Sequence, residues 1–420
     1  MSGLTSGEVC MSSREFLRVA VVGTGGIFMG AHLRAYPELK DAALVGFYDV
    51  VRSKAEYAAK RYREMIREKL GKAEAPEERE RLNTILKEIK VYSNLEELAE
   101  DEEIDIIDVC TPPKWHDEVA IPLIKSRHNV MVEKPMARTW IESNEVVKAV
   151  KESGVLYQHN ENWVYSNVAV FVKKLIESGI IGDLISVTIT FEHNGPEWKH
   201  WFWDPFVDGG GTLIDMGTHA ITAIWFLVGF DKKPCYVKSC CMKVNFPIRY
   251  IAGHMKRINV DDYANIKIIF EDRRTKDVVI GNAISSWCSS LYAHRDILRV
   301  EGSEGSIRME YEEGKAVLIL TTRGGGMRKV PIQRDDSFAN EIRNFVNCVR
   351  YREKSITDET IGSETMAIIG AAYLSELEER RLVALGEFKE YAGKYLKEAG
   401  NYKEAADMLI RDLMKPYRAI

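Results

Sequence analysis

Lys134, Asp215 and His219 have the residue types and positions best suited to moving a proton. Asp215 and His219 are four residues apart, which places them on one face if the segment is helical. A carboxylate beside an imidazole can set its tautomer and raise its basicity, as general-base catalysis requires. Lys134 follows an apolar run and precedes Pro135, where an ammonium could polarise an oxygen atom. Taken alone, these residues also fit a surface lysine and a capped helix with a core histidine.

A second set of residues suits the binding of a pyrophosphate. The β-branched run Phe16–Val22 is typical of a buried strand, and the loop Gly23-Thr24-Gly25-Gly26 and a predicted helix over 27–36 follow it. Gly23 would permit a tight turn, and Gly25 would let backbone N–H groups approach phosphates at the helix N-terminus. Phe28 stands where the usual pattern has its third glycine. The loop residues that we expect to contact a dinucleotide are Gly23, Gly25, Gly26, Ile27 and Phe28.

Asp49 and Arg52 bear on which dinucleotide is bound. Asp49 lies at the end of the next predicted strand, where it would accept hydrogen bonds from the adenosine ribose hydroxyls. Because a carboxylate repels a 2′-phosphate, NAD is favoured over NADP. Arg52 counts in the other direction, since it could stack on adenine or pair with a phosphate.

Two further motifs lie where open α/β sheets bind ligands, at the carboxyl ends of predicted strands. Thr111-Pro112-Pro113 and His116 follow a strand over 104–110, and Glu133-Lys134-Pro135 ends a strand over 129–133. The peptide between Lys134 and Pro135 is a candidate for the cis form. The cofactor-binding residues that we predict from these motifs are Thr111, Pro112, His116 and Glu133.

The elements that must position these residues alternate between strand and helix. Strand patterns at 16–22, 43–48, 89–92, 104–110, 129–133 and 155–158 are mostly separated by helical ones. Such alternation predicts a doubly wound parallel sheet, the Rossmann fold. A charged helical insert over 52–90 interrupts it, and it is either a solvated hairpin or an oligomer contact or lid.

After residue 160 the pattern changes to a helix and seven alternating, β-rich runs between 184 and 321. These runs predict an α+β domain with an open, mainly antiparallel sheet. We therefore predict a disordered leader over 1–14, a Rossmann domain over 15–160, a substrate and oligomerisation domain over 161–385 and a helical C-terminal extension over 386–420.

Composition excludes several classes of partner. A net charge of −5 and a pI near 6.1 give no general affinity for nucleic acid. The longest apolar stretch, 221–230, is too short to span a bilayer, so no membrane is expected. The seven cysteines form no CxxC pair, which favours a reduced, cytoplasmic protein without a metal site.

The segment 192–206 is rich in tryptophan and polar side chains. Trp201 and Trp203 could stack on the apolar face of a sugar ring, and the alternative is that they anchor a loop or a dimer contact. Residues that could add to the same pocket are Trp287, Tyr292, His294 and Arg295.

Together the motifs resemble the glucose-fructose oxidoreductase / inositol dehydrogenase / MocA family over about 16–381. Its members carry the glycine loop, the Thr-Pro…His segment, Glu-Lys-Pro and a Gly-Gly-Gly…Asp-x-x-x-His segment in this order, as here with Gly209–Gly211, Asp215 and His219. The segment 162–165 resembles the family's linker. Many members have arginine where Trp163 or Val164 stands here, and Thr222 replaces a frequent acid.

The resemblance implies hydride transfer between a nicotinamide cofactor and a hydroxyl-bearing carbon of a sugar or polyol. His219 would take the hydroxyl proton, Lys134 would hold the substrate oxygen, and Asp215 would orient the substrate or His219. It also places Asn162 and Trp163 at the cofactor and Tyr165 at the substrate, and it suggests a homodimer or homotetramer. Two alternatives stay open: an NAD-dependent glycosidase or lyase that oxidises a sugar transiently, and a non-catalytic NAD-binding scaffold.

Overall fold

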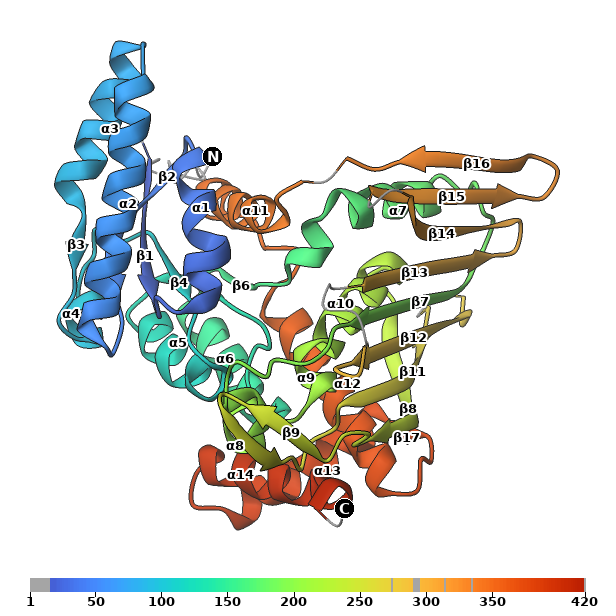
Figure 1. The fold of residues 1–420 in the computed structure, drawn as a ribbon. Coiled ribbons are helices and arrows are strands. Elements are labelled where there is room, and N and C mark those ends of the chain that lie inside the picture. The colour runs from blue at the N-terminus through green and yellow to red at the C-terminus, as the bar shows by residue number, and fades with distance from the viewer. Residues whose placement is uncertain (1–15, 273–274, 290–294, 313–314, 334, 419–420) are drawn as a thin grey trace, which may run out of the picture.

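A computed structural model describes residues 16–272, 275–289, 295–312, 315–333 and 335–418. Two large sheets, one on each side of a group of helices, organise the chain (Figure 1). The predicted leader over 1–14 lies outside the described residues, as do Tyr292 and His294 and the side chain of Arg295.

The first sheet is parallel throughout, with strand order β3-β2-β1-β4-β5-β6, and it confirms the predicted doubly wound topology. Its central strands are apolar because helices cover both faces. The strands are β1 Leu17–Val22, β2 Ala42–Tyr48, β3 Lys90–Val91, β4 Ile106–Val109, β5 Asn129–Val132 and β6 Tyr157–His159.

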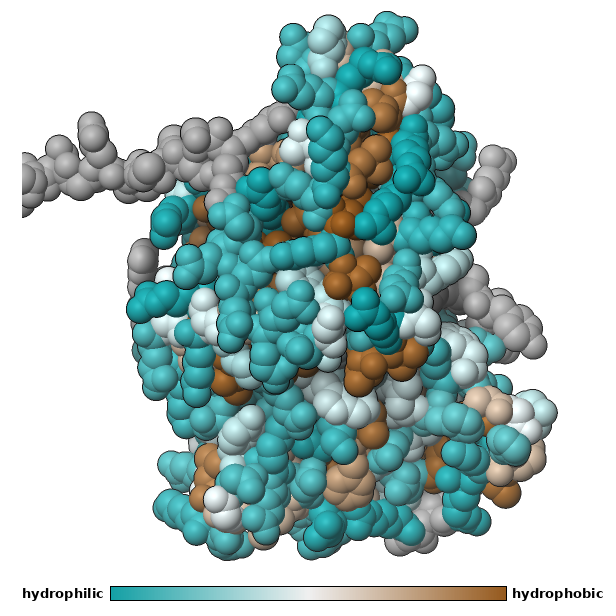
Figure 2. Space-filling model, turned by 90° about the vertical axis from the view of Figure 1, so that its left-hand side faces the viewer, coloured by the Kyte–Doolittle hydropathy of each residue, from teal (hydrophilic) through white to brown (hydrophobic). Residues whose placement is uncertain are grey.

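Helical segments connect these strands, and the charged insert forms a pair of long helices, α2 (Arg52–Lys72) and α3 (Pro76–Glu88). Alanines and Tyr62 of α2 pack on the sheet, and the outer sides of both helices carry charged residues. Figure 2 shows this side of the molecule as mostly hydrophilic, with a narrow hydrophobic strip. The remaining segments here are a π-helical turn Phe28–His32, α1 Leu33–Ala35, α4 Leu95–Ala99, α5 His116–Lys125 and α6 Trp140–Ser153.

The second sheet is mainly antiparallel, as predicted, with the order β16-β15-β14-β13-β7-β12-β11-β8-β17. Among the described strands of this sheet, only β7 and β12 pair in parallel. The short strands β16 and β17 and the hairpin of β9 (Ile248–Ile251) and β10 (His254–Arg257) are additions that the sequence pattern did not predict. The strands of the sheet are β7 Leu184–Glu192, β8 Lys233–Lys243, β11 Tyr263–Glu271, β12 Val278–Ser286, β13 Arg295–Gly302, β14 Gly305–Glu312, β15 Lys315–Thr322, β16 Gly326–Pro331 and β17 Val383–Ala384.

Helices cover one face of the second sheet, the face toward the first sheet (Figure 1). In the described part of the chain no single helix has the length and apolar composition to cross a membrane; one pair, 205–215 with 217–228, has them jointly but is bent by 48°. The helices of this half are α7 Asn167–Glu177, α8 Pro205–Asp208, α9 Thr212–Asp215, α10 Gly217–Val228, α11 Ser337–Tyr351 and α12 Glu359–Leu377.

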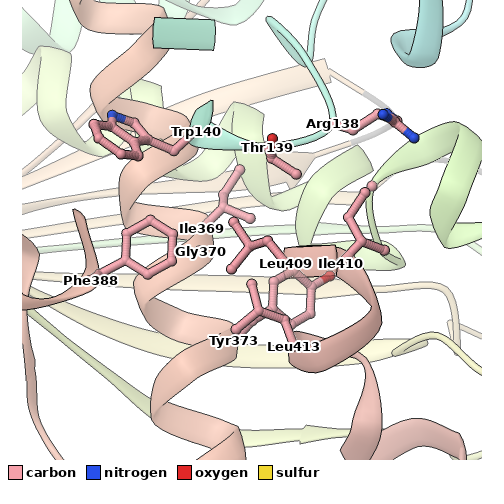
Figure 3. Close-up of a pocket in the computed structure, with 11 residues that line it drawn as sticks. Arg138, Thr139, Trp140, Ile369, Gly370, Tyr373, Phe388, Leu409, Ile410 and Leu413 are labelled. Carbon is pink, nitrogen blue, oxygen red and sulfur yellow. The ribbon is translucent and has the colours of Figure 1, made fainter. Parts of the chain in front are cut away.

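The C-terminal segment is helical, as predicted, and it packs on the first half of the chain. It consists of α13 (Leu385–Glu398), α14 (Tyr402–Leu413) and α15 (Lys415–Arg418). Lys403 Nζ lies 2.7 Å from Asp117 Oδ1 on α5 and 3.3 Å from Glu142 Oε1 on α6. A cavity of about 20 Å³ lies at this seam. Figure 3 shows the mostly apolar side chains that line it. It has room for about one water molecule, and its lining includes none of the proposed catalytic residues.

Candidate active site

The glycine loop connects β1 to the π-helical turn and lies at the carboxyl edge of the parallel sheet. Gly23 has φ +91°, and a Cβ there would lie 2.8 Å from the backbone carbonyl of Cys110, so this position needs glycine. A Cβ on Gly25 or Gly26 would meet no atom within 4 Å. These two residues therefore leave open space in front of the N–H groups at the helix start, which fits a pyrophosphate.

Asp49 ends β2 beside this loop, as predicted. Its Oδ2 accepts hydrogen bonds from Thr24 N at 2.9 Å and Thr24 Oγ1 at 3.2 Å, and its Oδ1 accepts one from Val51 N at 2.8 Å. The carboxylate thus fixes the shape of the loop, and Oδ1 keeps a further lone pair for a ligand. Arg52 points to Glu56 Oε1 at 2.8 Å and Ser93 Oγ at 3.3 Å.

The packing of Phe28 shows how this position accommodates a large side chain in place of the third glycine. Its side chain is fully buried and meets Phe47 of β2 edge to face, with ring centroids 6.3 Å apart. The π-helical turn is wider than an α-helical one, and the ring fills the space between helix and sheet. The loop, Asp49 and the open glycines together fit a dinucleotide.

Lys134 and Asp215 form an ion pair across the two halves of the chain. The Lys134 ammonium Nζ lies 2.7 Å from Asp215 Oδ1 and 3.0 Å from the Asp215 carbonyl oxygen, and the two side chains are 17% and 8% exposed. Burial disfavours both charged forms, but the attraction between the ammonium and the carboxylate outweighs this cost. The pKa of Lys134 is therefore raised above its usual value, and that of Asp215 is held well below its usual range. Lys134 is a cation throughout the neutral range and cannot act as the base. Its peptide bond to Pro135 is cis, as predicted.

Aromatic side chains hold Asp215 from the other side. Trp287 is fully buried and donates from Nε1 to Asp215 Oδ2 at 3.2 Å. Trp203 stacks at a tilt on Trp287, with centroids 4.7 Å apart. Arg249, which the sequence reasoning missed, donates to the Trp287 carbonyl at 3.0 Å and to Asp262 Oδ2 at 3.0 Å. Trp203 and Trp287 are thus a rigid support beneath Asp215.

The three glycines before Asp215 allow close packing at the start of α9. A Cβ on Gly210 would lie 2.2 Å from Tyr373 Oη, and one on Gly211 would lie 2.0 Å from the Asp261 carbonyl oxygen. Asp261 caps the turn by accepting hydrogen bonds from Gly211 N at 3.2 Å and Leu213 N at 2.9 Å. This cap directs Asp215 toward Lys134.

The prediction that Asp215 and His219 share one helix is wrong. The helical path breaks at Met216, so Asp215 ends α9 while His219 lies in the first turn of α10. The bend of 48° sends the two side chains to different partners. Asp215 pairs with Lys134, and His219 Nδ1 makes a short contact with Glu161 Oε1.

Glu161 is the functional candidate that the sequence reasoning missed. It lies just beyond β6, at the carboxyl edge of the parallel sheet, and its side chain is fully buried. The signal that could have found it is an acid at the end of the last parallel strand, the same rule that identified Lys134. His219 is 16% exposed, and its Nε2 has no hydrogen-bond partner among the described residues. The Phe191 ring meets the imidazole edge to face at 5.9 Å.

His116 connects two loops at the carboxyl edge of the parallel sheet. Its Nδ1 lies 2.8 Å from the Pro135 carbonyl oxygen and its Nε2 lies 2.6 Å from the Thr111 carbonyl oxygen, so it joins the loops after β4 and β5. Burial lowers the pKa of His116. The Thr111 hydroxyl is buried without a hydrogen-bond partner among the described residues.

Tyr165 does not lie at the site, contrary to prediction. Its hydroxyl is buried in a polar network and lies 2.7 Å from Thr357 Oγ1 and 3.2 Å from both Gln158 Oε1 and Ser355 Oγ. Residues 162–165 form a 3-10 turn, and the Tyr165 hydroxyl accepts a hydrogen bond from Asn344 Nδ2 of α11 at 3.4 Å.

Three other predicted residues, Asn162, Trp163 and Trp201, each contact a neighbouring side chain. Asn162 Nδ2 donates to Ser337 Oγ at 2.9 Å, and Trp163 packs edge to face on Phe191 at 5.4 Å. Trp201 stacks on Phe202 at 3.7 Å and is partly exposed.

A sealed cluster of charged side chains lies inward of the glycine loop. His32 Nδ1 lies 2.8 Å from Asp108 Oδ2, and His32 Nε2 lies 2.8 Å from Glu133 Oε1. Tyr36 donates to the same Asp108 oxygen at 2.7 Å. Glu341 of α11 faces the group with both carboxyl oxygens buried and unpartnered among the described residues, and burial raises its pKa well above the usual value. Atoms of His32, Glu133 and Glu341 lie within 4.8 Å of one another, and the two contacts of His32 have hydrogen-bond geometry.

The geometry brings together a fixed cation, a histidine with one free ring nitrogen and a loop shaped for phosphates. Lys134 can hold a hydroxyl or carbonyl oxygen, and His219 Nε2 can accept a proton from it. Such a site can remove a hydroxyl proton while a hydride leaves the same carbon.

Comparisons with known proteins agree with this geometry. Residues 17–161 match the model of an oxidoreductase family with an NAD-binding Rossmann fold (GFO_IDH_MocA), and residues 170–308 match the GFO/IDH/MocA C-terminal domain. A glucose-6-phosphate 3-dehydrogenase of Bacillus subtilis is 27% identical over 276 residues, which cover 65% of this chain and 68% of the relative.

Two further proteins extend the comparison. A scyllo-inositol 2-dehydrogenase (NADP(+)) of Bacillus subtilis is 32% identical over 145 residues, 34% of this chain and 40% of that protein. The solved structure of a levoglucosan dehydrogenase with NADH and levoglucosan has a TM-score of 0.71 at 22% identity, and the match covers 88% of this chain and 99% of that one.

Proposed function

The chain belongs to the GFO/IDH/MocA family of oxidoreductases, and from this premise we propose that it oxidises a hydroxyl-bearing carbon of a sugar, polyol or related compound. Two contacts carry the proposal: Lys134 Nζ pairs with Asp215 Oδ1, and His219 Nδ1 contacts Glu161 Oε1 so that its Nε2 is free. Lys134 and Glu161 both follow strands at the sheet edge that carries the glycine loop. The relatives are named as dehydrogenases of sugars and inositol, which agrees with this substrate class.

Lys134, His219 and Asp215 have separate roles in the proposed reaction. Lys134 holds the substrate oxygen and stabilises the negative charge that develops on it. His219 Nε2 takes the hydroxyl proton, and Asp215 keeps the ammonium in place. The bound dinucleotide supplies the hydride acceptor in this direction and the donor in reverse. The glycine loop, Asp49 and the Thr111 segment would hold the dinucleotide.

We propose NAD as the preferred cofactor. Asp49 sets a negative charge where a 2′-phosphate would lie, and the nearby Arg52 side chain is paired with Glu56. The family contains an NADP-dependent relative, so this preference has to be measured directly.

The deciding experiment is a panel of sugars, polyols and sugar acids, followed by absorbance of NADH and, separately, of NADPH. We expect net NADH formation with one or more panel members. Product release with firmly bound NAD and no net NADH would instead favour the glycosidase or lyase mechanism. A dinucleotide that binds while all chemistry stays unchanged in Lys134→Ala and His219→Ala would favour the scaffold.

We also propose that the outer face of the second sheet pairs with a second copy in a homodimer, or in a homotetramer built from such pairs. No helix of the described part of the chain covers this face, and Tyr236, Val278, Ile280 and Ile297 are each 38–51% exposed on it. An uncovered apolar sheet face favours association. Light scattering should report an oligomer for the native chain and a monomer for Ile280→Glu. The six described cysteines are free, which supports a reducing, cytoplasmic setting.

A further inference from the structure

We propose that Glu161 is a positioning residue that acts through His219, so that the proton acceptor of this site is a Glu161–His219 pair. The sequence pattern instead suggests Asp215 as the partner of this histidine. The proposal rests on the proposed oxidoreductase function for its kinetic part, while its structural part, the tautomer of His219, can be measured without any substrate.

The contact defines which ring nitrogen is free. An ionised carboxylate can only accept hydrogen bonds, so Nδ1 of His219 must carry the proton that it donates to Glu161 Oε1. In the neutral ring Nε2 then holds a lone pair. Because Nε2 has no partner among the described residues, that lone pair is available to a substrate hydroxyl.

Asp215 is already engaged elsewhere. Its Oδ1 accepts from Lys134 Nζ at 2.7 Å and its Oδ2 from Trp287 Nε1 at 3.2 Å. Neither oxygen makes a hydrogen bond to His219 in the described part of the chain. Asp215, the acid at the family spacing, therefore pairs with Lys134. Glu161, from the other half of the molecule, contacts His219.

Several groups surround Glu161, and none of them neutralises it by direct contact. His159 of β6 is buried with both ring nitrogens unpartnered among the described residues, and burial lowers its pKa to about 4, so it is uncharged. Lys134 is paired with Asp215, and burial raises the pKa of Glu341. Glu161 Oε2 is itself buried and unpartnered among the described residues. Among the described residues, the side-chain hydrogen-bond partner of Glu161 is therefore His219.

This arrangement accounts for both the proton and the hydride that leave the substrate. In the oxidising direction the O–H bond breaks and its proton moves to His219 Nε2, while the C–H bond breaks and the hydride leaves with its electron pair for the dinucleotide. The oxygen lone pair forms the carbonyl bond. The imidazolium that results carries a positive charge beside Glu161, which stabilises it. The same pair returns the proton when the reaction runs in reverse.

The experiment compares Glu161→Gln, which keeps the volume but removes the charge, with Glu161→Asp, which keeps the charge. We expect Glu161→Gln to lower kcat about 10- to 100-fold, which is less than the roughly 10²- to 10⁴-fold expected for loss of the base itself, because His219 remains. The acid limb of its pH profile should move to lower pH, because an imidazole without a carboxylate partner is less basic. Glu161→Asp should recover part of both changes, and dinucleotide affinity should stay within about 3-fold of the native value.

The matched control is Glu142→Gln. Glu142 is equally buried and paired, with Arg138, but it lies in α6 outside the site. It should lower thermal stability while leaving the acid limb where it is. A Glu161→Gln protein that behaves like Glu142→Gln, with kcat within about 3-fold of native and an unshifted limb, would show that Glu161 is merely structural.

A substrate-free readout separates this inference from the proposed function. In protein labelled with ¹⁵N-histidine, the His219 signals are identified by their loss in His219→Asn among the nine histidines of the chain. We expect the Nδ1–H tautomer in the native protein and a shift toward Nε2–H in Glu161→Ala. An unchanged tautomer would overturn the inference even if the enzyme oxidises its substrate. Failure of every panel substrate, with the tautomer as expected, would instead count against the proposed function.

Discussion

Two groups of buried charges in this molecule differ in what their atoms are free to do. At the site, Lys134 and His219 remain 17% and 16% exposed, and His219 keeps one ring nitrogen free. In the sealed cluster, His32 is fully buried and both of its ring nitrogens contact carboxylates at 2.8 Å. The first group can meet a substrate and the second cannot.

The comparison teaches that perturbation of a charge is not by itself a sign of catalysis. Burial lowers the pKa of His32, but Asp108 outweighs burial and the pKa is raised well above 6.5. That shift is at least as strong a signal as the one at Lys134, yet it belongs to a histidine that no ligand can reach. Access to a free atom, rather than the shift, distinguishes the two groups.

The largest expected effect is on stability. His32→Leu would leave Asp108 and Glu133 buried without their cation, so the free energy of unfolding should fall by about 3–5 kcal/mol. Denaturant unfolding measures the change, and the exposed His254→Leu is the matched control, expected to stay near native. A loss below about 1 kcal/mol in His32→Leu would contradict the role given to the cluster.

The pH dependence of the same variant has a definite sign. Because the pKa of His32 is raised on folding, its protonation stabilises the protein fully below about pH 6.5 and this contribution is lost as the pH rises through the folded value. The native protein should therefore lose stability, relative to His32→Leu, as the pH rises above 6.5. Parallel curves would contradict this assignment.

The next effect is on rate. Lys134→Met removes the group that holds the substrate oxygen, and kcat should fall about 10²- to 10³-fold, as for other donors to a developing oxyanion. Part of the variant's instability comes from the unpaired Asp215, so the double variant with Asp215→Asn should regain stability without regaining rate. Recovery of both would show that Lys134 acts only as a structural partner.

The smallest effect concerns the cofactor. Asp49→Ser removes hydrogen bonds to a charged group, each worth about 1.5–3 kcal/mol, so the KM for NAD should rise about 10- to 100-fold. The KM for NADP should rise less or fall. Arg52→Ala is the control, and it should change the KM for NAD by less than about 3-fold because its guanidinium pairs with Glu56. Equal changes for both cofactors in Asp49→Ser would remove Asp49 as the discriminating residue.

Much of the fold follows from sequence because its signals are local. The central parallel strands β1, β2, β4 and β5 are short, mainly apolar runs, and the predicted cis peptide at Pro135 is confirmed. The hairpin of β9 and β10 was missed because its strands are largely exposed, and its turn uses Ala252 and Gly253 at positive φ. Exposed strands lack the apolar alternation on which such predictions depend.

The partners within the site could not be predicted for a different reason. The four-residue spacing predicts Asp215 and His219 on one helix, but the helical path breaks at Met216 between α9 and α10. Glu161 follows the last strand of the first sheet and contacts His219 of α10, 58 residues away along the chain. Such contacts depend on tertiary structure, which local patterns do not encode.

The most direct test of the central claim is single-turnover hydride transfer in His219→Asn, followed by absorbance of the reduced dinucleotide with the substrate that the panel identifies. We predict a rate lowered about 10²- to 10⁴-fold, as expected for loss of a general base, with dinucleotide affinity near native. A rate within about 3-fold of native would contradict the assignment of this edge of the sheet as the reaction centre.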